Sequence, residues 1–298
     1  MTRFSSRALR GVGFCALAAL VIGGGALNQV AGAPASAAPS QPARPATLTF
    51  TGELTQGGWI RGLAPAGVRE IALDGEVLPL GQADGAWFAA FDRDAKGTAT
   101  LTARYADGRV ETRQITVAPR DWQIEHINVA RTKGGPSAAF MKIRRPELER
   151  IGAARAMQTG AQGWRQSFIW PAQGRISGRF GSQRIYRGEP GAYHSGLDIA
   201  TGTSGTPFVA PADGVVILAA EKPFSLEGNL LMIDHGNGLN SAFLHCSAIL
   251  VKAGDHVRQG QVIGRIGATG RATGPHLHWS IKWRDARLDP LLFTGPMK

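Results

Sequence analysis

Short apolar runs bounded by glycine-rich turns repeat through the second half of this 298-residue chain. Four runs have the length of a strand: "DGVVILAA", "NLLMIDHG", "SAFLHCSA" and "QVIGRIGATG". Runs this short, closed on both sides by turn residues, favour buried strands over helices. The pattern therefore predicts that residues 169–298 form an antiparallel β domain with almost no helix.

The first half carries a different β pattern, with alternating apolar and polar residues in "TLTFTG" and "RVETRQITV". Asp-Gly pairs at 74–75, 84–85 and 107–108 are typical of tight hairpin turns. About five to seven strands in so short a segment predict a small β-sandwich over residues 48–118. This segment has no clustered histidines, cysteines or paired carboxylates, so we interpret it as a binding or positioning module.

The N-terminal residues 1–37 have the pattern of an export signal. Arg3, Arg7 and Arg10 precede an apolar run, and "ASA" supplies the small residues of a cleavage site. An N-terminal membrane anchor is the alternative, because the apolar run is only marginally long enough to span a bilayer. The proline-rich residues 38–47 are then a flexible spacer.

A linker over residues 119–168 joins the two β segments and contains one predicted helix. "PELERIGAARAMQ" (Pro146–Gln158) has proline at the first helical position and acids in the first turn. The sequence thus predicts a mostly β protein: a small N-terminal β-sandwich, a linking helix and a C-terminal antiparallel β domain.

The net charge indicates which partners the chain can bind, and the cysteine content limits its disulfides and metal sites. The net charge is +11, and removal of residues 1–37 lowers it to +8, which suits a polyanionic surface such as a cell-wall polymer or anionic lipid head groups. A transient contact with a membrane surface therefore stays open, whereas no nucleic-acid motif is present. Cys246 is the one cysteine outside residues 1–37, which excludes an internal disulfide and a cysteine-rich zinc cluster; we interpret it as a buried apolar residue.

Two of the seven histidines stand one residue apart, in "GPHLHW". In a strand, His276 and His278 project from the same face, with Cα atoms roughly 7 Å apart. Two imidazoles that face one cavity suggest that one holds a ligand and the other acts on it.

The partners of these histidines lie upstream. "YHSGLDIA" contains His194 and Asp198, which share a face if the segment enters a strand. With one histidine of "HLH" they form a two-histidine, one-carboxylate set that suits Zn²⁺ and leaves a fourth position for water. His245, on a predicted strand, is placed to orient or deprotonate that water or to stabilise charge on an attacked carbonyl. The alternative is a closed structural zinc site that uses both "HLH" histidines.

The order "HSGLDIA … PADGVV … FLHCS … VKAGDHVRQGQVIGRIGATGRATGPHLHW" closely resembles the lysostaphin-type, or LytM-domain, zinc metallopeptidases. These are β-rich hydrolases that cut the peptide cross-links of bacterial peptidoglycan. The resemblance covers roughly residues 170–293.

The resemblance implies a role for each of five residues, all of which are filled without substitution. His194, Asp198 and His278 correspond to the ligands of one zinc ion, and His245 and His276 to the two catalytic histidines that do not bind it. The implied function is an exported zinc metalloendopeptidase of the periplasm or cell envelope, which cuts peptidoglycan cross-links through a metal-activated water.

Two other functions compete with hydrolysis. Relatives that lack ligands serve as non-hydrolytic activators of other wall hydrolases, although the complete set here favours an enzyme. "PADGVV … AGDHVRQGQVIG" also resembles the hairpins of biotinyl and lipoyl carrier domains, but the pattern expected around Lys222 is missing.

The remaining candidates have weaker support. We interpret His126, His235 and His256 as structural or solvated. The arginine-containing segment "GRISGRFGSQR" (Gly174–Arg184) is a candidate lining for a groove that accepts an acidic peptide or glycan.

Overall fold

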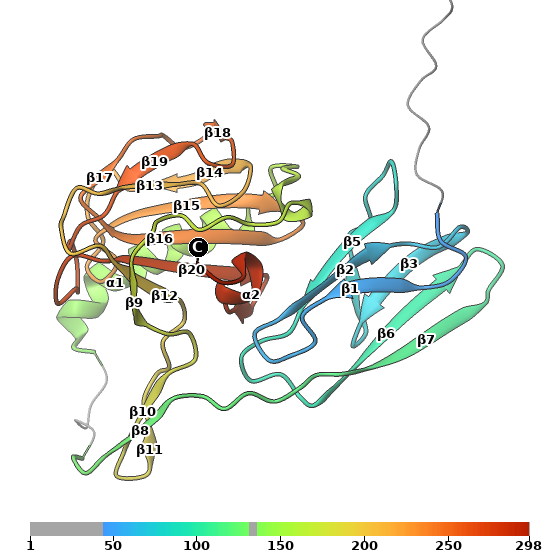
Figure 1. The fold of residues 1–298 in the computed structure, drawn as a ribbon, viewed down its shortest axis with the longest axis horizontal. Helices are drawn as coiled ribbons and strands as arrows, with labels where there is room; N and C mark the ends of the chain where they lie inside the picture. The colour runs from blue at the N-terminus through green and yellow to red at the C-terminus, as the bar shows by residue number, and fades with distance from the viewer. Residues whose placement is uncertain (1–43, 131–135, 298) are drawn as a thin grey trace, which may run out of the picture. The chain divides into compact units, whose positions relative to one another are not determined.

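The computed structural model describes residues 44–130 and 136–297, and its architecture is mostly β (Figure 1). This confirms the predicted fold class. The predicted export signal lies outside the described residues, as does most of the predicted spacer. The domain boundaries drawn from the sequence stay predictions, and the described residues all belong to one compact unit.

Seven strands lie within residues 49–116 and form two antiparallel sheets. The first sheet has the order β1-β2-β5, and the second has the order β4-β3-β6-β7. The strands are β1 (Thr49–Gly52), β2 (Trp59–Leu63), β3 (Val68–Leu73), β4 (Glu76–Leu78), β5 (Ala86–Ala90), β6 (Thr98–Tyr105) and β7 (Val110–Thr116). Fully buried side chains of both sheets, such as Ile60 and Leu101, belong to one apolar core.

Two of the three Asp-Gly pairs form hairpin turns as predicted, whereas Asp84 and Gly85 lie between β4 and β5, which belong to different sheets. Asp74 and Gly75 have φ values of 50° and 84° between β3 and β4, the left-handed backbone that a two-residue hairpin requires. Gly108, with φ of 87°, lies in the turn between β6 and β7. These turns set the register of the hairpins.

The linking helix α1 spans Ala138–Ala156, so the predicted start at Pro146 is wrong. The Ser137 side chain caps the helix by accepting a hydrogen bond from the N–H of Phe140, at 3.1 Å. No acid occupies the first turn, and Pro146 lies inside the helix. Proline is well tolerated at a first helical position, so Pro146 was a plausible first residue. The N-terminus of α1 is instead set by the hydroxyl cap of Ser137.

An eight-stranded antiparallel sheet dominates the C-terminal half, as predicted. Its order is β18-β14-β15-β16-β20-β12-β9, and β21 pairs with β20. The strands are β9 (Arg175–Gly178), β12 (Leu197–Ala200), β14 (Gly214–Ala219), β15 (Asn229–Gly236), β16 (Leu239–Cys246), β18 (His256–Val257), β20 (Leu277–Trp283) and β21 (Ala286–Leu288). The four apolar runs of the sequence supply β14, β15, β16 and a strand of a second sheet.

Two three-stranded sheets and two short helices complete the fold. One sheet has the order β13-β19-β17, and the other has the order β11-β10-β8 with β8 and β10 parallel. These elements are β8 (Ile124–Ile127), β10 (Gln183–Tyr186), β11 (Glu189–Pro190), β13 (Pro207–Val209), β17 (Ala248–Ile249), β19 (Val262–Arg265), the 3₁₀ helix η1 (Gly163–Arg165) and α2 (Leu291–Thr294). A linker strand thus pairs with a strand that precedes the predicted metal ligands.

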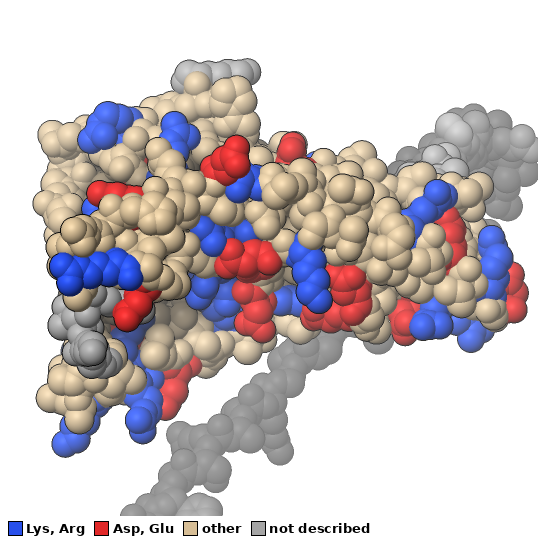
Figure 2. All heavy atoms as spheres, turned by 90° about the horizontal axis from the view of Figure 1, so that it is seen from below, with Lys and Arg blue, Asp and Glu red and all other residues tan. Residues whose placement is uncertain are grey.

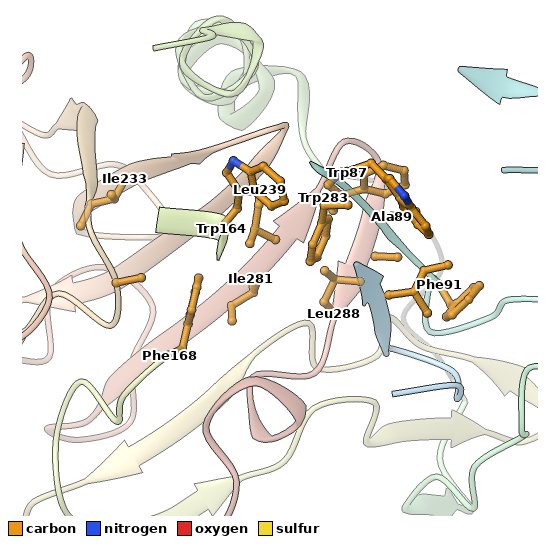
Figure 3. Packing of buried hydrophobic residues seen from close by; sticks show 14 of the residues in the cluster. Trp87, Ala89, Phe91, Trp164, Phe168, Ile233, Leu239, Ile281, Trp283 and Leu288 are labelled. Carbon is orange, nitrogen blue, oxygen red and sulfur yellow. The ribbon is translucent and has the colours of Figure 1, made fainter. Parts of the chain in front are cut away.

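One hydrophobic core runs from the sandwich into the large sheet (Figure 3). Phe88 of β5 lies edge-on to Trp164 of η1 and to Trp283 of β20, with ring centroids 6.4 and 6.2 Å apart. Burial of each large side chain stabilises the fold by about 1.5–3 kcal/mol. The sandwich and the large sheet therefore share stabilising contacts.

The surface carries both signs of charge. On the face shown in Figure 2, basic and acidic side chains are interspersed, so the excess of positive charge is not segregated there. Within residues 44–130 and 136–297, no helix has both the length and the apolar character needed to span a membrane.

Candidate metal centre and catalytic site

The three predicted metal ligands converge at one point of the large sheet. Asp198 of β12 and His278 of β20 are direct partners in the antiparallel register, so both side chains leave the same face. Asp198 Oδ1 lies 2.9 Å from His278 Nδ1 and 3.1 Å from His194 Nε2. The two imidazole nitrogens are themselves 3.1 Å apart.

His194 reaches this point from a loop rather than from a strand, because β12 begins at Leu197. The predicted strand entry at His194 is therefore wrong, although the predicted convergence with Asp198 is observed. Backbone hydrogen bonds hold the loop in place: the N–H of His194 donates to the carbonyl of Ser182, and the N–H of Gly181 donates to the carbonyl of His194, both at 2.8 Å.

Hydrogen bonding fixes which atom of His194 faces the cluster. Its Nδ1 lies 3.0 Å from the carbonyl oxygen of Arg179, and a carbonyl can only accept, so Nδ1 carries the proton of the neutral ring. The lone pair on Nε2 then points at Asp198 Oδ1 and His278 Nδ1. Electron-rich atoms this close together are best satisfied by a shared cation.

The donor set fits zinc. Ligand atoms about 2.0–2.2 Å from one tetrahedral Zn²⁺ lie roughly 3.3 Å from one another, close to the separations observed. Two glycines make room for the cluster: a Cβ at Gly178 would lie 2.3 Å from Asp198 Oδ2, and one at Gly196 would lie 2.6 Å from His278 Nε2. Among the described residues, His194, Asp198 and His278 are the one group that can share an ion, and His276 is not part of it.

The electrostatics keep the carboxylate ionised. Burial alone would raise the pKa of Asp198, but the adjacent imidazoles of His194 and His278 hold it well below its usual range. Burial tends to lower the pKa of His194, yet Asp198 raises it overall, whereas burial dominates at His278 and lowers its pKa. The carboxylate and the neutral His278 are thus in the forms that bind a metal.

The two predicted catalytic histidines face the same point. The ring centroids of His245 and His276 are 4.9 Å apart, and those of His245 and His278 are 6.2 Å apart. His276 Nε2 lies 3.7 Å from Asp198 Oδ1. His276 lies one residue before β20, so both twin histidines face the site as the alternation predicts.

Backbone carbonyls orient both rings in the same way. Nδ1 of His245 donates to the carbonyl of Thr269, and Nδ1 of His276 donates to the carbonyl of Gly274, each at 2.8 Å. In the neutral rings Nε2 is therefore free to accept a proton. Burial lowers the pKa of His245, with neighbouring histidines adding to the effect, so this ring stays neutral at neutral pH.

A groove of about 1210 Å³ leads to the metal cluster. The linker strand β8 and the β10–β11 hairpin supply much of its wall, and Arg271 adds a positive charge on the side of the "HLH" loop. Its lining residues are Gln123, Ile124, Glu125, Val129, Ala130, Ser182, Gln183, Arg184, Tyr186, Gly191, Ala192, Tyr193, His194, Asp198 and Arg271. Of the three arginines in the segment 174–184, Arg184 alone is in this set.

The three remaining histidines of the described residues and Cys246 are not part of the metal cluster. His126 and His256 are exposed on β8 and β18. His235 is fully buried, with Nδ1 bonded to the carbonyl of Asp213 and Nε2 to Ser241 Oγ, both at 2.8 Å. Cys246 is buried, and burial raises the pKa of its thiol to about 12, in line with the predicted apolar role.

Sequence reasoning missed Gly178, Gly196 and Arg271. Gly196, between two predicted ligands in "HSGLD", carried a usable signal, because a glycine there allows close approach of another strand. Gly178 gave none, since its contact with Asp198 arises from the pairing of β9 with β12.

Comparison with known proteins identifies the domain that carries this site. Residues 192–290 match the model of "Peptidase family M23". Over 124 residues, the chain is 40% identical to peptidoglycan DD-endopeptidase ShyA of Vibrio cholerae serotype O1, an overlap of 41% of this chain and 28% of the relative. It is also 40% identical, over 126 residues, to DD-carboxypeptidase/endopeptidase Mpg of Neisseria meningitidis serogroup B, an overlap of 41% and 27%.

A solved structure from Pseudomonas aeruginosa, assigned to peptidase M23, is similar over a larger part of the chain. It has a TM-score of 0.62 and 29% sequence identity, and the match covers 82% of this chain and 96% of that one. The chain spans about a quarter of the length of the two curated relatives named above. The family match, the relatives and the structural similarity agree: this chain contains a LytM-type domain of peptidase family M23.

Proposed function

We propose that this chain is an exported zinc metalloendopeptidase that hydrolyses the peptide cross-links of bacterial peptidoglycan. The observation that carries the proposal is the convergence of His194 Nε2, Asp198 Oδ1 and His278 Nδ1, mutually 2.9–3.1 Å apart, beside two further histidines. A purely structural zinc site needs four protein ligands and no adjacent acid–base groups.

His194, Asp198 and His278 would hold one Zn²⁺ per chain. A zinc ion bound there supplies Lewis acidity, which lowers the pKa of a water and polarises the scissile carbonyl. The Asp198 carboxylate contributes one negative charge toward the metal, and the two imidazoles contribute none. This leaves a net positive site that favours an oxyanion.

His245 and His276 are the proposed catalytic residues. Both present a free Nε2 toward the cluster while Nδ1 is held by a carbonyl, so each can accept a proton on one side without turning. One ring can take the proton of the attacking water, and the protonated ring can then donate to the leaving amine or bond to the developing oxyanion.

The groove supports a peptide rather than a small ligand as substrate. Its volume of about 1210 Å³ suits an extended chain. Arg271 adds a cationic group that complements a carboxylate of an acidic peptide stem, whereas Arg184 is paired with Glu125 at 2.8 Å. Because the relatives include enzymes named DD-endopeptidases, a cross-link between D-amino acids is the first substrate to test.

Export to the cell envelope fits this substrate, which lies outside the cytoplasmic membrane. The support is the signal-like pattern of residues 1–37. The competing proposal is a non-hydrolytic wall-binding activator, which the complete set of five residues disfavours.

The test is release of soluble fragments from purified peptidoglycan and from defined cross-linked muropeptides, followed by mass analysis. We expect cleavage of a peptide bond, with each product pair heavier by one water, and one zinc ion per chain. Binding to peptidoglycan without fragment release, at full zinc occupancy, would instead establish the activator. The Asp198→Asn chain serves as the control for contaminating hydrolases.

A further inference from the structure

The linking helix α1 is attached to the β domain by a buried ionic cluster. Arg144 is 9% exposed and makes a bidentate contact with Glu227, in which Nη1 and Nη2 lie 2.6 Å from Oε2 and Oε1. Nη1 also lies 3.0 Å from Oε2 of Glu147, one turn further along the helix. A two-pronged guanidinium–carboxylate contact fixes orientation as well as distance.

A second contact of the same helix holds the same loop. The Oε1 atom of Glu147 accepts from the backbone N–H of Ser225, and its Oε2 atom accepts from Ser225 Oγ, both at 2.6 Å. Ser225 and Glu227 lie in the loop that joins β14 to β15. In Figure 1, α1 lies against the large sheet, and the contacts of α1 with β14 agree with this view.

This loop in turn fixes the backbone of His245. The N–H of His245 donates to the carbonyl of Glu227 at 2.8 Å. His245 has a φ of +63°, a left-handed backbone that is uncommon for a residue with a Cβ. Such a conformation persists only when its surroundings hold it in place.

The loop also contacts the residue that orients the His245 ring. Gly228 packs so tightly on Thr269 that a Cβ would lie 2.3 Å from Thr269 Oγ1. The carbonyl of Thr269 accepts a hydrogen bond from Nδ1 of His245, at 2.8 Å. The loop therefore supports the His245 backbone directly and its ring through Thr269.

We propose that Arg144 is a positioning residue for His245. The path runs from the Arg144 guanidinium through Glu227 to the strained His245 backbone and hence to the position of the imidazole. Arg144 and the rest of α1 lie outside residues 192–290, which match the family. The linker thus completes the catalytic domain instead of only connecting it. This inference rests on the proposed function, because it assumes that His245 acts in the hydrolysis.

The experiment compares Arg144→Gln with Arg145→Gln, the exposed neighbour on the same helix, in the zinc-loaded full chain. With a defined muropeptide as substrate, we expect Arg144→Gln to lower kcat by about tenfold to a hundredfold, the scale of a displaced catalytic group. KM and zinc content should stay within twofold, and Arg145→Gln should match the starting protein. Arg144→Lys, which keeps the charge but loses the second prong, should recover part of kcat.

A double-mutant cycle separates positioning from general damage. On a His245→Ala background, Arg144→Gln should cause almost no further loss of kcat, because both changes remove the same contribution. An equal loss on both backgrounds would overturn the inference, as would wild-type kcat in Arg144→Gln. If Arg144→Gln does not fold, Ser225→Ala takes its place, with a smaller loss expected on the starting background and none on His245→Ala.

NMR of the imidazole nitrogens distinguishes failure of this inference from failure of the proposed function. Arg144→Gln should shift the His245 signals and leave those of the exposed His256 unchanged. If the starting protein does not hydrolyse any muropeptide, the proposed function fails while the shift can still be observed. Unchanged His245 signals would overturn the positioning role even in an active enzyme.

Discussion

The sandwich of β1–β7 and the large C-terminal sheet are both antiparallel, but they differ in what they bury. The sandwich buries almost exclusively apolar side chains. Among the described residues, nine polar or charged residues are buried, and Arg93 is the one that lies in the sandwich segment. The others follow from Arg144 onward and include His245 and His278.

This difference separates stability from chemistry. A buried polar group costs free energy unless it is hydrogen-bonded, so a region that serves only stability has little reason to contain many. In the C-terminal half, hydrogen bonds offset the cost of burying polar groups. An example is His235, which is bonded to Asp213 and Ser241.

His278→Ala should abolish both zinc binding and hydrolysis, because it removes a ligand atom that lies 2.9 Å from Asp198 Oδ1. The measurements are zinc per chain by elemental analysis and fragment release from peptidoglycan. Glu70→Ala, which breaks an exposed ion pair with Arg104 in the sandwich, is the matched control and should leave both unchanged. Zinc retained in the His278 variant would contradict the assignment.

Phe88→Ala should destabilise the whole of the described fold by about 3–5 kcal/mol, because Phe88 is 1% exposed and lies against Trp164 and Trp283. Denaturant unfolding measures the change. Val77→Ala, at a position that is 52% exposed, should stay within about 0.5 kcal/mol. If the Phe88 variant unfolds the sandwich alone and keeps full activity, the shared core does not couple the two regions.

His276→Ala should leave zinc bound but reduce kcat by about a hundredfold or more, the usual contribution of a positioned acid–base group. Its Nε2 lies 3.7 Å from Asp198 Oδ1, beside the ligands rather than among them. Kinetics on a defined muropeptide and zinc analysis give the two readouts. Loss of zinc together with activity would instead make His276 a ligand.

His235 should make stability depend on pH between about 6.5 and 4. Burial lowers the pKa of the folded His235 to about 4, against an ordinary value of 6.5, so the unfolded chain binds the additional proton in this window. Stability contributed by the neutral ring is complete above pH 6.5 and falls as the pH drops, by at most about 3 kcal/mol. Denaturant unfolding against pH should show a shallower slope for His235→Gln, and an unchanged slope for the exposed His256→Gln.

The sequence indicated the local features of the fold and missed those that depend on distant contacts. Apolar runs and Asp-Gly pairs predicted β14–β16 and the hairpin turns, because both signals are local. Pro146 misled the placement of the helix start, since a proline typical of a first turn here lies inside α1. The five candidate site residues could be named from motif order, but their separations depend on the pairing of β12 with β20.

The support around the site could not be predicted. Gly178 and Arg144 carry no motif, and their contacts with Asp198 and Glu227 join residues 20 and 83 positions apart along the chain. Such contacts follow from the fold as a whole. They are also the features that distinguish this region from the sandwich, where Arg93 is the one buried charged residue and pairs such as Arg104 with Glu70 are exposed.

X-ray absorption at the zinc edge of the zinc-loaded chain reports directly which atoms bind the metal. We expect one zinc per chain, with two imidazole nitrogens, one carboxylate and at least one oxygen from solvent in the first coordination shell. Three imidazoles with no solvent oxygen would place His276 on the metal and close the position that hydrolysis requires. That result would contradict the proposed hydrolase.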